Sequence, residues 1–174
     1  MNSKITIENA WDKYLEELNE ASRARKQSSW YEHFMKLAYT VAERSKDPRT
    51  QVGCVIATED KIVASTGYNG IPRNVEDRKE RMLPPQKYQW TAHAEENAVA
   101  QAARVGRALS NGTAFVTHAP CSRCARSLIQ AGITTVIIGN GVTNMAKEEF
   151  EVAQTMFREA RVHVQYLDAM GTDP

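Results

Sequence analysis

The chain has 174 residues, of which 42% are hydrophobic and 25% are charged, proportions that are ordinary for one globular domain. Its formal net charge of +1 argues against binding to a long nucleic acid, because proteins that bind one usually present a strongly basic face. No apolar run is long enough to cross a bilayer, and the amino-terminal stretch lacks the apolar core of a signal peptide. Three cysteines, two of them in a CxxC pair, indicate metal binding in a reducing cytoplasm better than a disulfide framework.

The amino-terminal segment predicts a helix that stands apart from the main domain. Ile7–Ala24 is amphipathic, with apolar side chains three or four residues apart at Trp11, Tyr14, Leu15 and Leu18. A polar break over residues 23–29 follows it. We therefore predict an N-terminal helical extension over residues 1–28, a main domain over 29–168 and a C-terminal tail over 169–174.

The main domain opens with a second amphipathic helix, Trp30–Arg44, which ends ahead of Pro48 because the residue before a proline disfavours helix. Two β-rich runs, Val52–Ala57 and Ile62–Gly67, are separated by a short polar stretch, which is typical of a hairpin. Gly70–Trp90 is long, polar and contains prolines. We expect this segment to be a loop that is functional or mobile.

Helical and strand-like segments alternate through the rest of the chain. The predicted helices are Ala94–Val105, Arg123–Gln130 and Met145–Glu159, and the predicted strands are Thr113–Thr117, Thr135–Ile138 and Arg161–Leu167. Strands joined by helices tend to be parallel and covered on both faces. The sequence therefore predicts an α/β fold, a three-layer α/β/α sandwich on a five-stranded mixed sheet. We expect the functional site at the ends of strands that are followed by helices.

Two short motifs indicate a metal site. Cys121 and Cys124 stand three residues apart at the start of a predicted helix, so both sulfurs can face one point, and the helix amino terminus favours thiolates. His93 begins another predicted helix and can supply a third ligand. Three nitrogen and sulfur ligands suit zinc and leave a position open for water, which is typical of a catalytic site.

Glu95, two residues beyond His93, provides a carboxylate that can accept a proton from the attacking water and return it to a leaving amine. The alternative is a closed structural zinc site with a fourth ligand, for which His118 is the nearest candidate. Such a site has no need of Glu95. The two motifs together favour catalysis.

The motifs His93-Ala94-Glu95 and Pro120-Cys121-Ser122-Arg123-Cys124 resemble the cytidine deaminase superfamily, whose signature is H-x-E followed by P-C-x-x-C. Further segments are similar to the deoxycytidylate (dCMP) deaminases. These are Ser45-Lys46-Asp47-Pro48, Gln51-Val52-Gly53, Gly67-Tyr68-Asn69-Gly70-Ile71-Pro72, Lys87-Tyr88, Asn97-Ala98 and Gln130-Ala131-Gly132-Ile133. The resemblance spans Trp30 to Leu167.

The resemblance implies a zinc-dependent hydrolase that converts dCMP to dUMP and ammonia, breaking a C–N bond of a cyclic amidine. By the same resemblance, Glu95 protonates N3 of the pyrimidine and later the departing amine. Asn69 matches a family asparagine that hydrogen-bonds the nucleotide near its sugar; the alternative is a turn residue beside Gly70. The other implied substrate contacts are Ala94, His118, Ala119, Pro120 and Arg123.

A phosphate needs a basic partner, and several cations flank the motifs. Arg73, Lys87 and Arg123 are candidates, together with Arg78 and Arg81, although a solvated surface charge is the commoner role for any one of them. Tyr88 and Trp90 can stack on a base or pack in a core or an interface. Arg73, Lys87 and Tyr88 are also the candidates for an effector site.

The sequence departs from the family pattern at Arg49, Ala92 and Ala119. Ala119 stands where a large aromatic residue is frequent, so we expect a pocket that can admit a 5-substituted dCMP. The resemblance further implies a homohexamer regulated by dCTP and dTTP, with Mg²⁺ accompanying a triphosphate effector.

Three alternatives stay open. A deaminase of tRNA adenosine or polynucleotide cytosine shares the metal core but needs a basic, aromatic-lined groove. A riboflavin-pathway pyrimidine deaminase is disfavoured by the GYNG segment. A catalytically inactive zinc-binding paralogue has no use for Glu95.

Overall fold

The computed structural model describes residues 11, 13–16 and 29–167. Trp11 and residues 13–16 are helical, and the rest of the predicted helix Ile7–Ala24 lies outside the described residues, as does the predicted tail over 169–174. The main domain begins with α2, Trp30–Ala42, whose amino terminus carries a capping box between Ser29 and Glu32. This cap satisfies two backbone N–H donors at the helix start.

The strands form one five-stranded sheet within the described residues, in the order β2-β1-β3-β4-β5. They are β1 (Gly53–Ala57), β2 (Val63–Tyr68), β3 (Thr113–His118), β4 (Thr135–Gly141) and β5 (His163–Tyr166). The predicted hairpin is confirmed, because β1 pairs with β2 antiparallel. β1 is also antiparallel to β3, whereas β3, β4 and β5 run parallel. The sheet is therefore mixed, as predicted.

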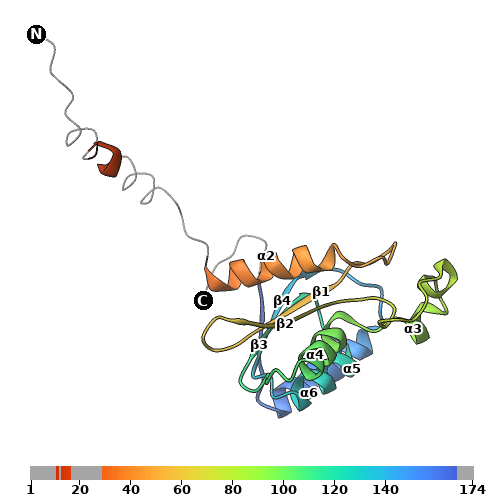
Figure 1. Cartoon of the computed structure of the whole chain (residues 1–174). Helices are drawn as coiled ribbons and strands as arrows, with labels where there is room; N and C mark the ends of the chain where they lie inside the picture. Colours follow the sequence, from red (N-terminus) through yellow and green to blue (C-terminus); the bar gives the residue numbers. More distant parts are fainter. Residues whose placement is uncertain (1–10, 12, 17–28, 168–174) are drawn as a thin grey trace, which may run out of the picture.

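Helices cover both faces of the sheet, with α2 on one side and α4 (Ala94–Arg104), α5 (Ser122–Gln130) and α6 (Lys147–Glu159) on the other (Figure 1). Alternate strand residues divide between the two layers, as the two-residue period of a strand requires. Val55 and Phe115 pack against α2, and Cys54 and Val116 pack against α4 to α6. The predicted three-layer α/β/α sandwich is confirmed.

The segment predicted as one long loop contains two single-turn helices. They are η1, a 3₁₀ helix over Lys79–Met82, and α3, Lys87–Trp90. The guanidinium of Arg81 lies 4.0 Å from the ring centre of Trp90, a cation–π contact that packs the two turns together. The polar composition of the segment gives no indication of such contacts. The prediction of an irregular loop is therefore corrected, because the segment contains two helical turns.

The helices α4 and α5 begin at the same end of the sheet, where the predicted site residues gather. His93 directly precedes α4, and Cys121 directly precedes α5. None of the helices in the described ranges is long and apolar enough to cross a membrane.

Candidate metal centre and active site

Close packing of α4 against β2 places His93 and Glu95. A side-chain carbon at Gly67 of β2 would lie 2.2 Å from the carbonyl oxygen of Ala94 and 2.4 Å from the backbone nitrogen of Ala98. Only glycine allows a helix backbone so near a strand. The short side chains of Ala94 and Ala98, both fully buried, complete the contact.

The three predicted metal ligands lie together. Nδ1 of His93 is 3.5 Å from Sγ of Cys121 and 3.3 Å from Sγ of Cys124, and the ligand atoms of all three residues lie within 4.8 Å of one another. Both cysteines are buried. One imidazole nitrogen and two sulfurs at this spacing are a donor set that fits zinc.

Hydrogen bonds within this cluster shift the pKa values of the two cysteines in opposite directions. A hydrogen bond from the Cys124 thiol, with another from His93, lowers the pKa of Cys121 to about 3. The pKa of Cys124 is raised, because its thiol donates to Cys121 and is desolvated by burial. Two buried sulfurs that share one proton are what a divalent cation would convert into a pair of thiolates.

His118 does not join the metal ligands. Its Nδ1 lies 2.9 Å from the hydroxyl of Thr117, and burial lowers the pKa of the ring. In the described residues the metal-ligand group consists of His93, Cys121 and Cys124. The closed four-ligand alternative is therefore not formed by these residues, and a coordination position is left for water.

Glu95 is the titratable group beside this cluster. Its side chain is buried, with 3% of its surface exposed, and burial raises the pKa of its carboxyl to about 7. A pKa close to neutrality suits a group that must first accept and then return a proton. The arrangement thus places a group that can carry a proton beside the three candidate zinc ligands.

An open cavity of about 740 Å³ lies over the cluster. Its lining includes His93, Glu95 and Cys121 from the centre itself, and the predicted substrate contacts Asn69, Ala94, His118 and Ala119. The predicted effector or phosphate candidates Lys87 and Tyr88 also line it. Val142 and Met145, from the segment between β4 and α6, form an apolar side of the same cavity.

Three predicted contacts lie elsewhere. Pro120, Arg123 and Arg73 are not among the described residues that line the cavity. Arg73 instead hydrogen-bonds Gln101 at 3.0 Å, and Arg123 pairs with Glu96. The three residues lie in the segments where we expected substrate contacts. The side chains of the two arginines, however, already interact with other residues.

A buried polar network joins the loop to the sheet at the cavity wall. Nζ of Lys87 lies 2.6 Å from Asp47, and the same carboxylate accepts hydrogen bonds from the backbone N–H groups of Arg49 and Thr50. The amide of Asn69 accepts from Val52 N–H and donates to Thr50 O. Most of the hydrogen-bonding capacity of Asn69 is therefore used, and its Oδ1 keeps one lone pair for a ligand.

Sequence reasoning missed Arg49 as a site residue. The side chain of Arg49 is exposed and lines the cavity, and it makes no hydrogen bond or ion pair with any residue that the structure describes. Its departure from the family pattern was the available signal. Lys87, by contrast, is neutralised by Asp47.

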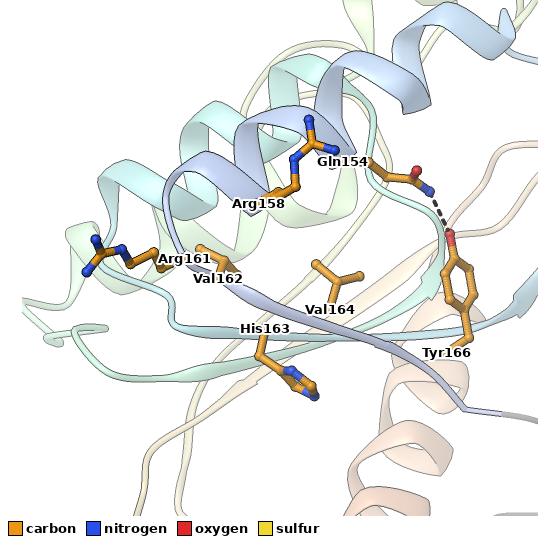
Figure 2. A pocket seen from close by; sticks show the side chains of 7 residues that line it. All are labelled: Gln154, Arg158, Arg161, Val162, His163, Val164 and Tyr166. Carbon is orange, nitrogen blue, oxygen red and sulfur yellow. Dashed lines mark hydrogen bonds between the residues drawn. The ribbon is translucent and has the colours of Figure 1, made fainter.

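A second hollow of about 540 Å³ lies between α6 and the edge strand β5. Figure 2 shows that its polar side chains diverge, with Arg158, Arg161 and His163 pointing in different directions, while Gln154 bonds Tyr166. Among the described residues, its lining brings together no group of metal-ligating side chains, so the cavity over His93 is the candidate functional site.

Comparison with known proteins agrees with this site. The family model for the cytidine and deoxycytidylate deaminase zinc-binding region matches residues 28–140. A protein of Aliivibrio fischeri described as an uncharacterized deaminase in the luxG 3′ region is 40% identical over 143 residues, covering 80% of this chain and 95% of the relative. The deoxycytidylate deaminase of Mus musculus is 37% identical over 140 residues, covering 76% of each chain. The solved apo structure of dCMP deaminase from cyanophage S-TIM5 matches with a TM-score of 0.62 and 25% identity, over 78% of this chain and 95% of that one.

Proposed function

This chain belongs to the cytidine and deoxycytidylate deaminase zinc-binding family, and we propose that it hydrolyses the 4-amino group of dCMP, releasing dUMP and ammonia. The observation that carries the proposal is the buried carboxylate of Glu95, which opens into the same cavity as His93 and Cys121. Relatives named deoxycytidylate deaminase, such as the mouse enzyme at 37% identity, support dCMP as the substrate.

The residues of the site have different roles in the proposed reaction. His93, Cys121 and Cys124 would hold zinc, which as a Lewis acid makes water a stronger nucleophile. Glu95 takes a proton from the attacking water and delivers it to N3 of the pyrimidine. It then transfers the second proton to the departing 4-amino group, so that water and the amine become a carbonyl and ammonia.

Contacts to the rest of the substrate are part of the proposal. Oδ1 of Asn69 accepts a hydrogen bond from the sugar, and the guanidinium of Arg49, which has no partner among the described residues, binds the phosphate. His118 and the backbone near Ala94 border the base. Ala119, Val142 and Met145 offer an apolar wall that admits a 5-substituent, and comparing kcat/KM for 5-methyl-dCMP and dCMP tests this point.

The decisive assay follows ammonia release from dCMP, dCTP and deoxycytidine with zinc-loaded protein. Glu95→Gln should keep zinc and lower kcat for dCMP by about 10²- to 10⁴-fold, the usual contribution of a positioned acid–base group. Glu159→Gln, an exposed change at the end of α6, is the matched control and should leave kcat unchanged. Full activity of the Glu95 variant would overturn the mechanism. Turnover of tRNA or oligonucleotide without turnover of dCMP would favour the polynucleotide alternative.

Cellular location, assembly and regulation extend the same proposal. The thiol ligands Cys121 and Cys124 favour a reducing cytoplasm, where they stay available for metal. The family resemblance predicts a homohexamer and control by dCTP and dTTP, with Mg²⁺ accompanying the triphosphate. Sedimentation of the protein with and without dCTP and Mg²⁺ tests the assembly and its response to the effector.

A further inference from the structure

We infer that the ion pair between Glu96 and Arg123 is a brace that positions the metal ligands, so that Arg123 acts on the metal centre rather than on the substrate. The inference rests on the zinc site of the proposed function. Glu96 lies in the first turn of α4, and Arg123 lies in the first turn of α5 between the two cysteine ligands. Nε of Arg123 is 2.9 Å from Oε1 of Glu96.

One carboxylate connects both helix starts. Oε2 of Glu96 accepts a hydrogen bond of 2.9 Å from the backbone N–H of His93, while Oε1 faces Arg123. The carboxylate therefore holds the histidine ligand from α4 and the cysteine-bearing turn of α5 at the same time. A shift of either helix relative to the other would separate His93 from the sulfurs and would break this pair.

The ion pair is partly exposed, but one of its atoms is buried. The side chain of Glu96 is 24% exposed and that of Arg123 is 43% exposed, but the Nε atom of Arg123 is itself buried and forms no hydrogen bond within the described residues. The carboxylate of Glu96 is the counter-charge beside that buried nitrogen. Deleting Glu96 therefore leaves this buried nitrogen without its counter-charge.

The charges of the two side chains also support this positioning role. Glu96 is an acidic side chain in the first turn of α4, and Arg123 places its positive charge beside it from the first turn of α5. The attraction between the two opposite charges favours the close approach of the two helix starts. Neither Glu96 nor Arg123 lines the cavity, so a ligand there need not touch the brace.

Zinc affinity tests the brace directly, by competition of the apo protein against a chromophoric chelator without any substrate. Glu96→Gln keeps an acceptor for His93 N–H but loses the charge, and Arg123→Gln loses the cation. Each should weaken zinc binding by on the order of tenfold, the usual effect of a group that supports a metal ligand. The double variant should be no weaker than the worse single variant, because the two side chains form one interaction.

Two further variants separate positioning from general destabilisation. Arg123→Lys should recover part of the affinity, since it restores the charge but not the planar guanidinium. Arg126→Gln, an exposed change on the same helix, is the matched control and should bind zinc as the unaltered protein does. In the cobalt(II)-loaded protein, the sulfur-to-metal absorption band should shift in Arg123→Gln and not in Arg126→Gln.

Zinc affinity of Arg123→Gln within twofold of the unaltered protein would overturn the inference, as would losses in the single variants that simply add in the double variant. Since no substrate is present, failure of the protein to deaminate dCMP would contradict the proposed function alone. Circular dichroism of each apo variant shows that the comparison is made on folded protein.

Discussion

At the scale of single residues, charge pairing decides which cation is free to bind a ligand. Lys87 and Arg49 both line the cavity, but Lys87 is paired with the buried carboxylate of Asp47 at 2.6 Å. Arg49 is exposed to the cavity and has no such partner among the described residues. A phosphate would gain a full charge-assisted hydrogen bond from Arg49, whereas it would have to compete with Asp47 for Lys87.

We therefore expect Arg49→Gln to lower kcat/KM for dCMP and to leave kcat/KM for deoxycytidine, which has no phosphate, unchanged. Hydrogen bonds to charged groups contribute about 1.5–3 kcal/mol, so the loss for dCMP should be about 10- to 100-fold. Steady-state kinetics with both substrates measures the effect. Arg44→Gln, at an exposed position, is the control, and equal losses for both substrates would contradict a phosphate role.

At the scale of elements, the site depends on how closely α4 approaches β2. Gly67 packs against the backbone between Ala94 and Ala98, with the nearest contact to an added carbon at 2.2 Å. Ala94 is flanked by His93 and Glu95, so the contact that packs α4 against β2 also sets the positions of a candidate metal ligand and of the candidate proton carrier. A substitution at Gly67 that displaced α4 would therefore displace both side chains.

Gly67→Ala should destabilise the fold by about 3 kcal/mol, the upper part of the range for overpacking a core, because backbone rather than a flexible side chain lies in the way. Urea unfolding measures the loss, and kcat should fall as α4 moves outward. Gly70→Ala is the matched control, since an added carbon there meets only the Tyr68 ring at an ordinary 3.6 Å. Equal stability of the two variants would show that α4 does not depend on this contact.

At the scale of the whole molecule, the pair of Lys87 and Asp47 joins the loop between β2 and α4 to the segment between α2 and β1. Burial by itself would raise the pKa of Asp47, but the hydrogen bond from Lys87 and those from Arg49 and Thr50 outweigh it, so the pKa is lowered from 3.8. A lowered pKa in the folded state means that the pair stabilises the fold above the ordinary pKa. The contribution is lost as the pH falls through the folded-state value.

Lys87→Met should therefore lower the free energy of unfolding by about 3 kcal/mol at pH 7, because it leaves the Asp47 carboxylate buried without its counter-charge. The difference from the unaltered protein should shrink as the pH falls below the ordinary pKa of 3.8 and through the lowered folded-state pKa, where Asp47 becomes protonated in the fold. Denaturant unfolding at several pH values measures this. Asp47→Asn with Lys87→Met should restore part of the stability, and a pH-independent difference would contradict the role of the pair.

Much of the fold could be predicted from the sequence because its signals are local. The alternation of β-rich runs with amphipathic helices led to the mixed sheet and its two helical layers, and the observed ends differ from the predicted ones by a few residues, as for β4, which continues to Gly141. The two turns η1 and α3 were missed, since contacts such as Arg81 over Trp90 leave no periodic pattern in so short a segment.

The sequence by itself predicted His93, Cys121 and Cys124 as zinc ligands and Glu95 as a proton carrier, because the spacing of these residues within two helix starts indicates their chemistry. Only the tertiary structure decided which cations remain free. The partners Asp47 and Lys87, and Glu96 and Arg123, come from segments distant in the chain, and pairing between such segments is set by packing rather than by any local pattern. For that physical reason Arg49 becomes the candidate phosphate ligand, and Arg123 becomes the candidate for positioning the metal ligands.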